Sequence, residues 1–207
     1  MMRLAATPLQ IGWVIVLILI YAAFIAWYGG QRTPVTPAQG AAFLDQARAN
    51  RQPGAEEHPE FRRNLESLIA RDDGREFLMV NIETHKTGPE AEAADAAYSR
   101  AVLPMLLRRG SFPVYVGKPV GPVLGALGSG VDRVAIVRYR SLYDLLDMTA
   151  DPAMSTGATH KFAALAHTEV FASRPVISAI QVRLTVGLML LVVGASGWLA
   201  LGRFLRS

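Results

Sequence analysis

The chain of 207 residues contains no cysteine. This absence excludes a disulfide-stapled fold, a thiol nucleophile and a cysteine-based metal site. Charge is also scarce, at 18% of residues against 51% hydrophobic residues. That balance is too apolar on average for an ordinary soluble domain and too charged for a simple bundle of membrane helices.

Two long stretches carry no charge at all. They are "LQIGWVIVLILIYAAFIAWY" at 9–28 and "LTVGLMLLVVGASGWLALG" at 184–202. About 20 apolar helical residues are enough to cross the hydrocarbon of a bilayer. Trp13, Trp27 and Trp198 lie toward the ends of these runs, where aromatic rings favour the interface. The sequence therefore predicts one transmembrane helix at 9–28 and a second within 177–203.

A cleaved signal peptide is the alternative interpretation of the first run. The run is longer than the usual apolar core of such peptides, and no A-x-A-like site follows it. A two-pass protein in a bacterial-type inner membrane is therefore expected. Arg3, Arg203 and Arg206 flank the runs on their outer sides, which favours cytoplasmic termini and an exported middle domain.

The basic excess does not indicate a nucleic-acid partner. The formal net charge is +4, but the basic residues are scattered and the chain has no basic run with interleaved aromatics. A solvated surface close to the lipid bilayer is the interpretation that we favour.

Between the two runs, residues 29–71 predict a linker and two short helices, at 41–50 and 59–71. Residues 72–176 show the regular patterns of a folded domain. These patterns predict strands at 76–84, 111–117, 131–139 and 161–172, and helices at 89–110, 141–150 and 152–159.

Two local signals accompany these elements. Ser141 is placed to cap the helix that follows it. Pro104 lies inside the helix at 89–110, and it predicts either a kink or a tightened last turn. The order β-α-β-β-α-β is the split arrangement of ferredoxin-like α+β domains.

Such a fold leaves one sheet face without helices. We assign Phe77, Met79, Asn81 and Glu83 to this bare face, because they alternate along the first strand. An exposed apolar sheet face usually marks an interface, so we expect a homodimer with two sheets packed face to face around a cavity. Phe77, Met79 and Tyr115 are the expected pocket and interface residues.

A polar patch is expected in the same cavity. His167 and Glu169 share one face of the last strand, as Asn81 and Glu83 do on the first. Together they could bind a metal or move a proton, and they are the candidate catalytic residues. The alternative is that they form hydrogen bonds across the dimer seam or lie at solvated strand ends. No dedicated metal site is predicted.

Glycines punctuate the apolar segment from Gly117 to Gly130. The segment lacks the Lys-Ser/Thr of a phosphate-binding P-loop and leads into a strand, so we expect an apolar lid or a membrane-facing loop. In the second transmembrane run, Gly187, Gly194 and Gly197 could let two helices approach closely.

The domain resembles the family called domain of unknown function 1330, in the dimeric α/β-barrel superfamily. The likeness rests on "DDGREFLMVNI", on Tyr98 with "RRGSFPVYVG", and on "DRVAIVRYRSLYDLLDM" with "HKFAALAHTEVFA". It covers about 72–173. The resemblance implies the fold and the dimer, but no reaction.

The wider superfamily includes haem-degrading monooxygenases. They place an asparagine on the first strand and a haem-ligating histidine before the last strand, where this sequence has Asn81 and His160. They also use a tryptophan in the second helical region, and "LYDLLDM" has none. No cofactor is predicted, and haem at His160 is kept as the alternative.

These observations predict an integral membrane protein that displays a dimeric domain. The domain would bind a small apolar ligand or a membrane-protein partner. One alternative is a cofactor-poor or haem-binding monooxygenase or isomerase. Another is a structural subunit of a membrane complex.

Overall fold

The computed structural model describes residues 7–29, 33–53, 58–176 and 182–204. The chain divides into two compact units, which are described separately. One contains residues 1–29 and 176–207, and the other spans Gly30–Pro175.

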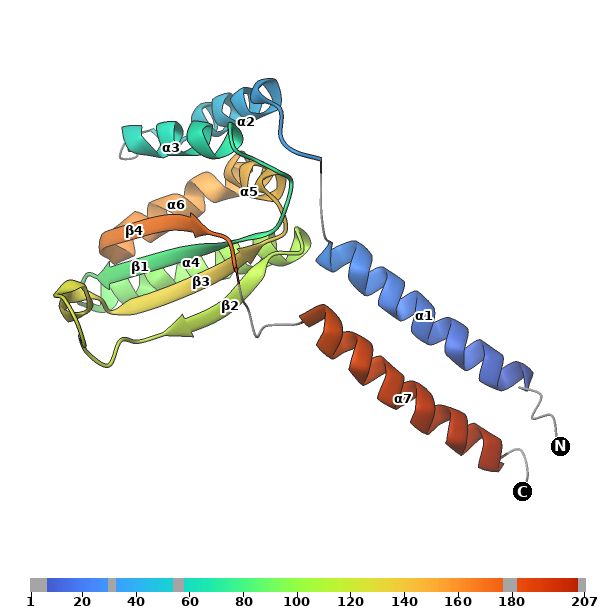
Figure 1. Ribbon diagram of the computed structural model, residues 1–207. Helices are drawn as coiled ribbons and strands as arrows, with labels where there is room; N and C mark the ends of the chain where they lie inside the picture. The colour runs from blue at the N-terminus through green and yellow to red at the C-terminus, as the bar shows by residue number, and fades with distance from the viewer. Residues whose placement is uncertain (1–6, 30–32, 54–57, 177–181, 205–207) are drawn as a thin grey trace. The chain divides into compact units, whose positions relative to one another are not determined.

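The first unit is a pair of long helices, α1 (Pro8–Tyr28) and α7 (Val182–Phe204), and both are long and apolar enough to cross a membrane (Figure 1). α1 begins where the sequence supplies a capping box. The hydroxyl of Thr7 accepts from the Gln10 backbone, and the Gln10 side chain accepts from the Thr7 backbone. Pro8 occupies the first turn, where its missing N–H has no cost.

Small residues of α7 face α1 of the same chain. A Cβ atom added at Gly197 would lie 2.5 Å from the indole nitrogen of Trp13. One added at Gly194 would lie 3.1 Å from a methyl group of Leu17. The predicted close approach at these glycines is therefore confirmed, and its partner is the other apolar helix of this chain.

The second unit contains a four-stranded antiparallel sheet with the strand order β2-β3-β1-β4 (Figure 1). The strands are β1 (Phe77–His85), β2 (Phe112–Gly117), β3 (Arg133–Tyr139) and β4 (Leu165–Ser173). The segment between β2 and β3 contains a short 3-10 helix, η1 (Leu127–Gly130).

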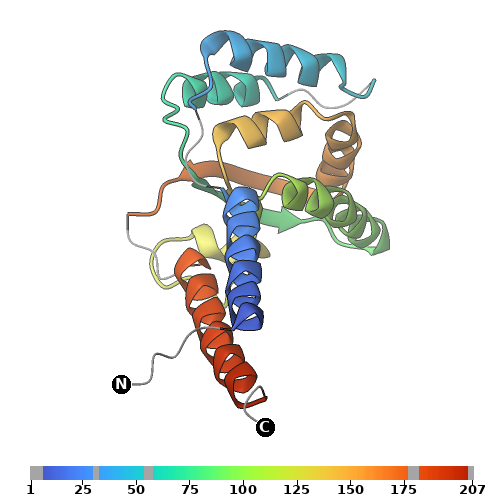
Figure 2. The same cartoon turned by 90° about the vertical axis from the view of Figure 1, so that its right-hand side faces the viewer.

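Helices cover one face of this sheet, in two layers (Figure 2). The inner layer consists of α4 (Pro89–Arg108), α5 (Leu142–Thr149) and α6 (Pro152–Ala164). The outer layer consists of α2 (Pro37–Ala49) and α3 (Pro59–Ile69), which pack over α5.

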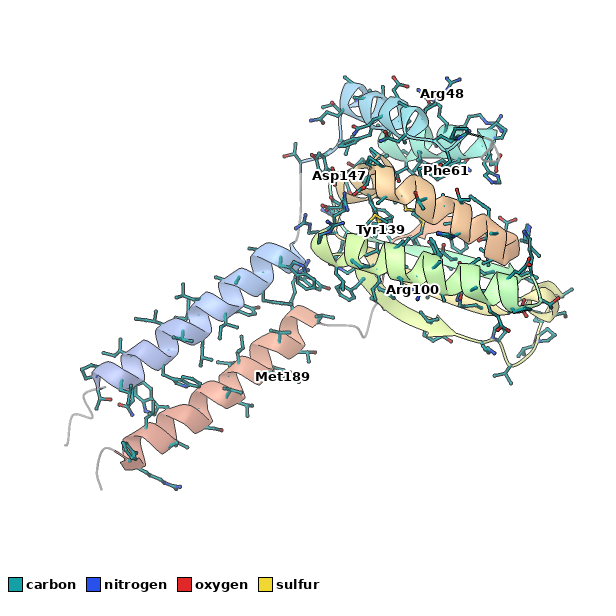
Figure 3. The ribbon with its side chains drawn as sticks, turned by 180° about the vertical axis from the view of Figure 1, so that it is seen from behind. Arg48, Phe61, Arg100, Tyr139, Asp147 and Met189 are labelled. Carbon is teal, nitrogen blue, oxygen red and sulfur yellow. The ribbon has the colours of Figure 1, made fainter. Side chains whose placement is uncertain are left out.

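The core lies between the sheet and the inner helices. Met105 of α4 and Leu146 of α5 are almost completely buried, and each such side chain contributes about 1.5–3 kcal/mol of hydrophobic stabilisation. The rings of Phe77 and Tyr139 stack at the floor of this core, with centroids 5.5 Å apart; Tyr139 is labelled in Figure 3. Both strands therefore direct an aromatic ring toward the helices.

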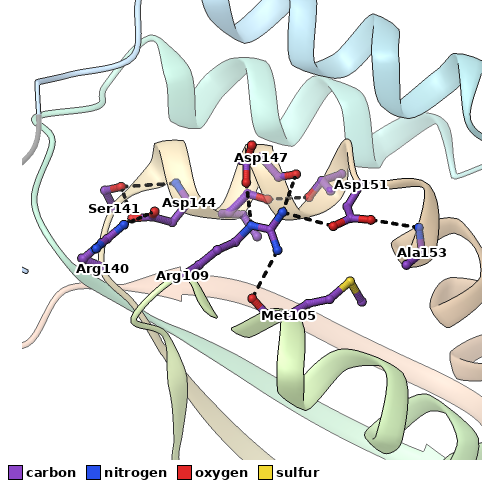
Figure 4. Close-up of polar contacts among 10 residues, drawn as sticks. Met105, Arg109, Arg140, Ser141, Asp144, Asp147, Asp151 and Ala153 are labelled. Carbon is purple, nitrogen blue, oxygen red and sulfur yellow. Dashed lines mark hydrogen bonds and ion pairs between the residues drawn. The ribbon is translucent and has the colours of Figure 1, made fainter. Parts of the chain in front are cut away.

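Two charged contacts fix α5 against its neighbours (Figure 4). Ser141 caps the helix as predicted, because its hydroxyl accepts from the Asp144 backbone. The Arg140 guanidinium donates to both oxygens of the Asp144 carboxylate, at 3.0 and 2.6 Å.

Arg109, just after α4, donates to the carboxylates of Asp147 and Asp151 at 2.6 and 3.2 Å. This arginine joins the end of α4 to α5 and to the start of α6.

The last strand is shorter than the sequence predicted. Residues 161–164 belong to α6 and not to β4, which begins at Leu165. The helix starts at Asp151, whose carboxylate accepts from the Ala153 backbone, and it packs on α4 where Gly157 lies against Val102. This tertiary contact prolongs α6 beyond the turn that its sequence suggests.

The start of α2 and the end of α4 show two further local effects. α2 begins at Pro37, earlier than predicted, because Thr36 and Gln39 form a capping box. α4 continues through Pro104 and ends in a tightened turn, in which the Arg109 N–H donates to the Leu106 carbonyl three residues back.

We expect Gly197→Val to weaken the pairing of α1 with α7, because its side chain would collide with Trp13. All three tryptophans of the chain lie in α1 or α7, so tryptophan fluorescence reports on this unit alone. In detergent, the midpoint of unfolding by added dodecyl sulfate should fall to a lower mole fraction.

Gly12→Val is the matched control, since nothing lies within 4 Å of a Cβ atom built at Gly12. Its midpoint should stay close to the wild-type value. Equal shifts for the two variants would contradict the packing described here.

Candidate functional site

A buried charged network lies between the sheet and the helices, at the end where β1 finishes. Arg133, the first residue of β3, donates from Nε to the Glu83 carboxylate at 2.6 Å. Its two terminal nitrogens donate to Asp95 of α4 at 2.8 and 2.7 Å, which is a bidentate pair. Hydrogen bonding to Asp95 raises the pKa of Arg133, and hydrogen bonding to Arg133 lowers the pKa of Asp95. Arg133 and Asp95 are therefore both held in their charged forms.

Lys161 of α6 extends this network. Its ammonium group lies 3.3 Å from the Asn81 side-chain oxygen and 4.0 Å from a Glu83 oxygen. It also lies 5.8 Å from the centre of the Tyr98 ring. Burial lowers the pKa of Lys161 and raises the pKa of Tyr98 to about 12. Two cations and two carboxylates thus neutralise each other, and Tyr98 stays protonated beside them.

Two polar atoms beside the network are buried without a hydrogen-bond partner among the residues described. They are His85 Nε2 and the hydroxyl of Thr168. His85 Nε2 is 3.9 Å from the Glu83 carboxylate, which is beyond hydrogen-bond distance. The network therefore has unused hydrogen-bonding capacity at its edge.

The sheet separates the four polar residues that the sequence analysis placed in one patch. Asn81 and Glu83 point toward the helices and are 8% and 3% exposed. His167 and Glu169 lie on the opposite face, next to Thr84 and Ile82 in the register, with side chains 65% and 64% exposed. His167 and Glu169 do lie together, at 3.2 Å. The expected convergence of all four is wrong.

The assignment of Phe77 and Met79 to the bare face is also wrong. Phe77 is buried in the helix-side core, and Met79 packs against that core. Only Tyr115, of the three predicted pocket residues, lies on the open face, where its side chain is half exposed. The alternating residues Leu78 and Val80 are equally apolar, so the period of the strand did not reveal which set faced the helices.

The open face is more apolar than the sequence analysis supposed. β3 places Val134 opposite Ile82 and Ile136 opposite Val80, and β4 places Phe171 beside Val80. Cross-strand partners share a face, so these side chains form one surface. Tyr115 and Phe171 at its two edges are 52% and 50% exposed. The apolar part of the open face is defined here by Leu78, Val80, Ile82, Tyr115, Val134, Ile136 and Phe171, and the register places Arg138, His167 and Glu169 on the same face around it.

The glycine-rich segment after β2 adds to this apolar surface. Val120, Val123 and Leu124 are almost completely exposed, at 107%, 102% and 97%. These are large apolar side chains in a loop without charge from Pro119 to Val131. Such a loop is the kind of surface that another molecule covers.

His160, which the sequence analysis kept as an alternative haem ligand, lies near the end of α6 and is half-buried. Within the described ranges, no group of three or more histidine, aspartate or glutamate side chains is placed to hold a metal ion. No contact of His160 bears on haem, and that expectation stays a prediction.

The sequence analysis did not identify Asp95, Arg133 and Lys161 as partners. One signal was present, because Asp95 lies three residues before Tyr98 on the apolar stripe of its helix. A carboxylate in that position indicates a buried cation, but the sequence does not say that the cation comes from β3.

Comparison with known proteins identifies structures of similar fold but indicates no function. No protein-family model matches the chain, and no curated protein matches it. The chain is similar to several solved structures, two of which are of the RPA0582 protein, of unknown function, from Rhodopseudomonas palustris. The first is 22% identical with a TM-score of 0.52, and the match covers 59% of this chain and 97% of that chain. The second, of the methylated protein, matches with the same identity and TM-score over 60% and 96%.

At this level of identity the likeness shows the fold alone. The resemblance to domain of unknown function 1330 therefore stays an interpretation of the sequence. The part that this chain shares with the RPA0582 structures is a small α/β sheet domain, and the function of that protein is itself unknown.

We expect Asp95→Asn to destabilise the α/β unit by about 1–3 kcal/mol at pH 7, because it leaves the half-buried Arg133 with a weaker partner. The folded-state pKa of Asp95 lies below its ordinary value of 3.8, so its stabilisation is complete above that pH and disappears as the pH falls through the folded value. The difference between wild type and variant should therefore shrink below about pH 4.

Urea unfolding of the Gly30–Pro175 unit, followed by circular dichroism, measures this difference. Asp45→Asn makes the same chemical change in an exposed pair with Arg62, and should cost about 0–1 kcal/mol. A loss for Asp95→Asn no larger than that control would contradict a stabilising role of the network.

Proposed function

We propose that this protein is a membrane-anchored binding domain that acts as a homodimer. The two open faces would pack against each other and enclose a space for a small apolar ligand. The observation that carries the proposal is the uncovered apolar surface of the sheet, with Val80 and Ile136 at its centre.

The arrangement of the elements supports this proposal. The strand order β2-β3-β1-β4, with helices on one face only, is the arrangement expected of a ferredoxin-like domain of dimeric-barrel type. In water, a continuous apolar surface of several side chains favours association, at roughly 25 cal/mol per Å² of apolar area removed. The exposed apolar loop at Val123 and Leu124 offers further area for the same contact.

The geometry favours binding over the enzyme alternative. That alternative needed Asn81, Glu83, His167 and Glu169 to face one cavity, and the sheet lies between the two pairs. On the open face only the exposed His167–Glu169 pair remains, at 3.2 Å. This pair could orient a polar end of a ligand in the dimer.

We expect Ile136→Glu to convert the dimer to a monomer. Face-to-face packing would bury two like charges at the seam, and such burial costs on the order of 3 kcal/mol or more, or a hundredfold in affinity. Native mass spectrometry of the full chain in detergent counts the subunits. Any co-purified ligand should appear on the wild-type dimer and disappear with it.

Leu103→Glu on α4 is the control, because Leu103 is an apolar side chain that is 44% exposed and lies on the helix side. It should remain dimeric. A wild-type protein that is monomeric and carries no ligand would overturn the proposal, and so would an Ile136→Glu dimer of unchanged affinity.

The proposal includes an orientation in the membrane. The arginines outside the two long apolar helices favour cytoplasmic termini and an exported α/β unit at a bacterial-type inner membrane. A green fluorescent protein fused at the C-terminus should fluoresce, and alkaline phosphatase fused at the same point should be inactive. The reverse pattern would show the opposite orientation.

A further inference from the structure

An open groove of about 250 Å³ lies at the end of the sheet where β1 begins and β4 finishes. Three arginines border it: Arg71 after α3, Arg75 before β1, and Arg174 after β4. All three side chains are exposed, so their guanidinium groups can turn toward a ligand. This groove lies at the opposite end of the sheet from the buried charged network.

The floor of the groove is apolar. Phe77, Leu142 and Ala172 line it, and the first two are 8% and 3% exposed. Three guanidinium groups beside an apolar floor suit a ligand that has an anionic group at one end and an apolar group at the other. The planar guanidinium group of arginine also matches the oxygens of a phosphate in two-point hydrogen bonds.

Two of the three carboxylates near the groove, Asp72 and Glu76, form no ion pair with the three arginines within the described ranges. Asp72 accepts from the backbone N–H groups of Val35 and Gly74, at 2.7 and 3.0 Å. Glu76 is bound by Arg138. The Asp72 and Glu76 carboxylates are therefore already engaged by other donors.

Asp73 is the single carboxylate shared by two of the arginines. It lies 2.7 Å from Arg174 and 3.7 Å from Arg75. Arg71 donates to the carbonyl and hydroxyl of Ser67, and no carboxylate within the described ranges lies at ion-pair distance from it. Exposed ion pairs are worth only about 0–1 kcal/mol, so an incoming phosphate can replace Asp73 at little cost.

The chain places this groove within a short reach of both long apolar helices. Arg174 and Val182, the first residue of α7, are eight positions apart, which is at most about 28 Å of extended chain. Val35, which binds Asp72, is six positions beyond Gly29, where α1 ends. If α1 and α7 cross a bilayer, as the proposed function holds, these two short connections tether the α/β unit that carries the groove to a membrane.

We propose that this groove binds the phosphate of an anionic phospholipid headgroup. The arginines would hold the phosphate oxygens, and the glycerol and first methylene groups would lie over Phe77 and Leu142. A free phosphate ester offers the same anion without the apolar part. The inference rests on the membrane anchoring of the proposed function, but it does not depend on the dimer.

The test is a titration of the full chain in detergent, followed by native mass spectrometry. The added probes are phosphatidylglycerol, phosphatidylcholine with the same acyl chains, and inorganic phosphate. The wild-type protein should retain phosphatidylglycerol in preference to the other two. Replacing all three groove arginines with glutamine, in R71Q/R75Q/R174Q, should weaken that retention about a hundredfold.

Two further variants sharpen the result. R48Q/R63Q/R100Q removes three exposed arginines elsewhere in the same unit and should keep the lipid, which controls for net charge. Asp73→Asn frees Arg75 and Arg174 from their shared carboxylate and should raise the retention several-fold. Because that variant predicts a gain, a fold damaged by substitution cannot imitate it.

Each outcome decides the assignment. Equal retention of phosphatidylglycerol by the wild type and R71Q/R75Q/R174Q would overturn it. Inorganic phosphate that binds as tightly as the lipid would overturn the lipid source. The same spectra also count the subunits, so the two proposals can fail separately. A monomer that retains the lipid would contradict the proposed dimer and support the lipid site in the groove. A dimer that does not prefer phosphatidylglycerol would support the dimer and contradict the lipid site.

Discussion

The structure depends on one constraint, which is that helices cover only one face of the sheet. Residues that alternate along β1 are therefore divided between two environments. Phe77 stacks on Tyr139 beneath the helices, and Asn81 and Glu83 follow it into the same interior. Their neighbours Leu78 and Val80 are left without a helix above them. The core and the apolar open face are consequences of the same alternation.

The same constraint explains why the charged network is internal. Once Phe77 faces the helices, Glu83 six residues later must face them too, and an isolated carboxylate there would be costly. Arg133 pairs with Glu83 across the strands, and Asp95 and Lys161 complete the balance from α4 and α6. The network thus joins the sheet to both helices at one end. Arg109 joins α4, α5 and α6 near the other end of α4.

The sequence predicted most elements because they carry local signals. Ser141 capped α5 as expected, and both long apolar helices lie within two residues of the uncharged runs. The boundary of α6 was missed because a contact between Gly157 and Val102, distant in sequence, prolongs the helix. The site was harder to predict. Both sets of alternating residues in β1 begin apolar, so the pattern gave the period of the strand but not which set faces the helices. The predicted polar patch therefore combined residues from the two opposite faces of the sheet.

The two ends of the sheet differ in a way that the alternation alone does not require. At one end the charges are buried and paired, so a ligand that entered would have to break strong contacts. At the other end Arg75 and Arg174 are exposed and share one carboxylate, so an anion can replace it cheaply. The chain also leaves the sheet toward α7 at that second end. An anionic ligand would therefore find available charges at the second end, while the charges of the first end hold β1, β3, α4 and α6 together.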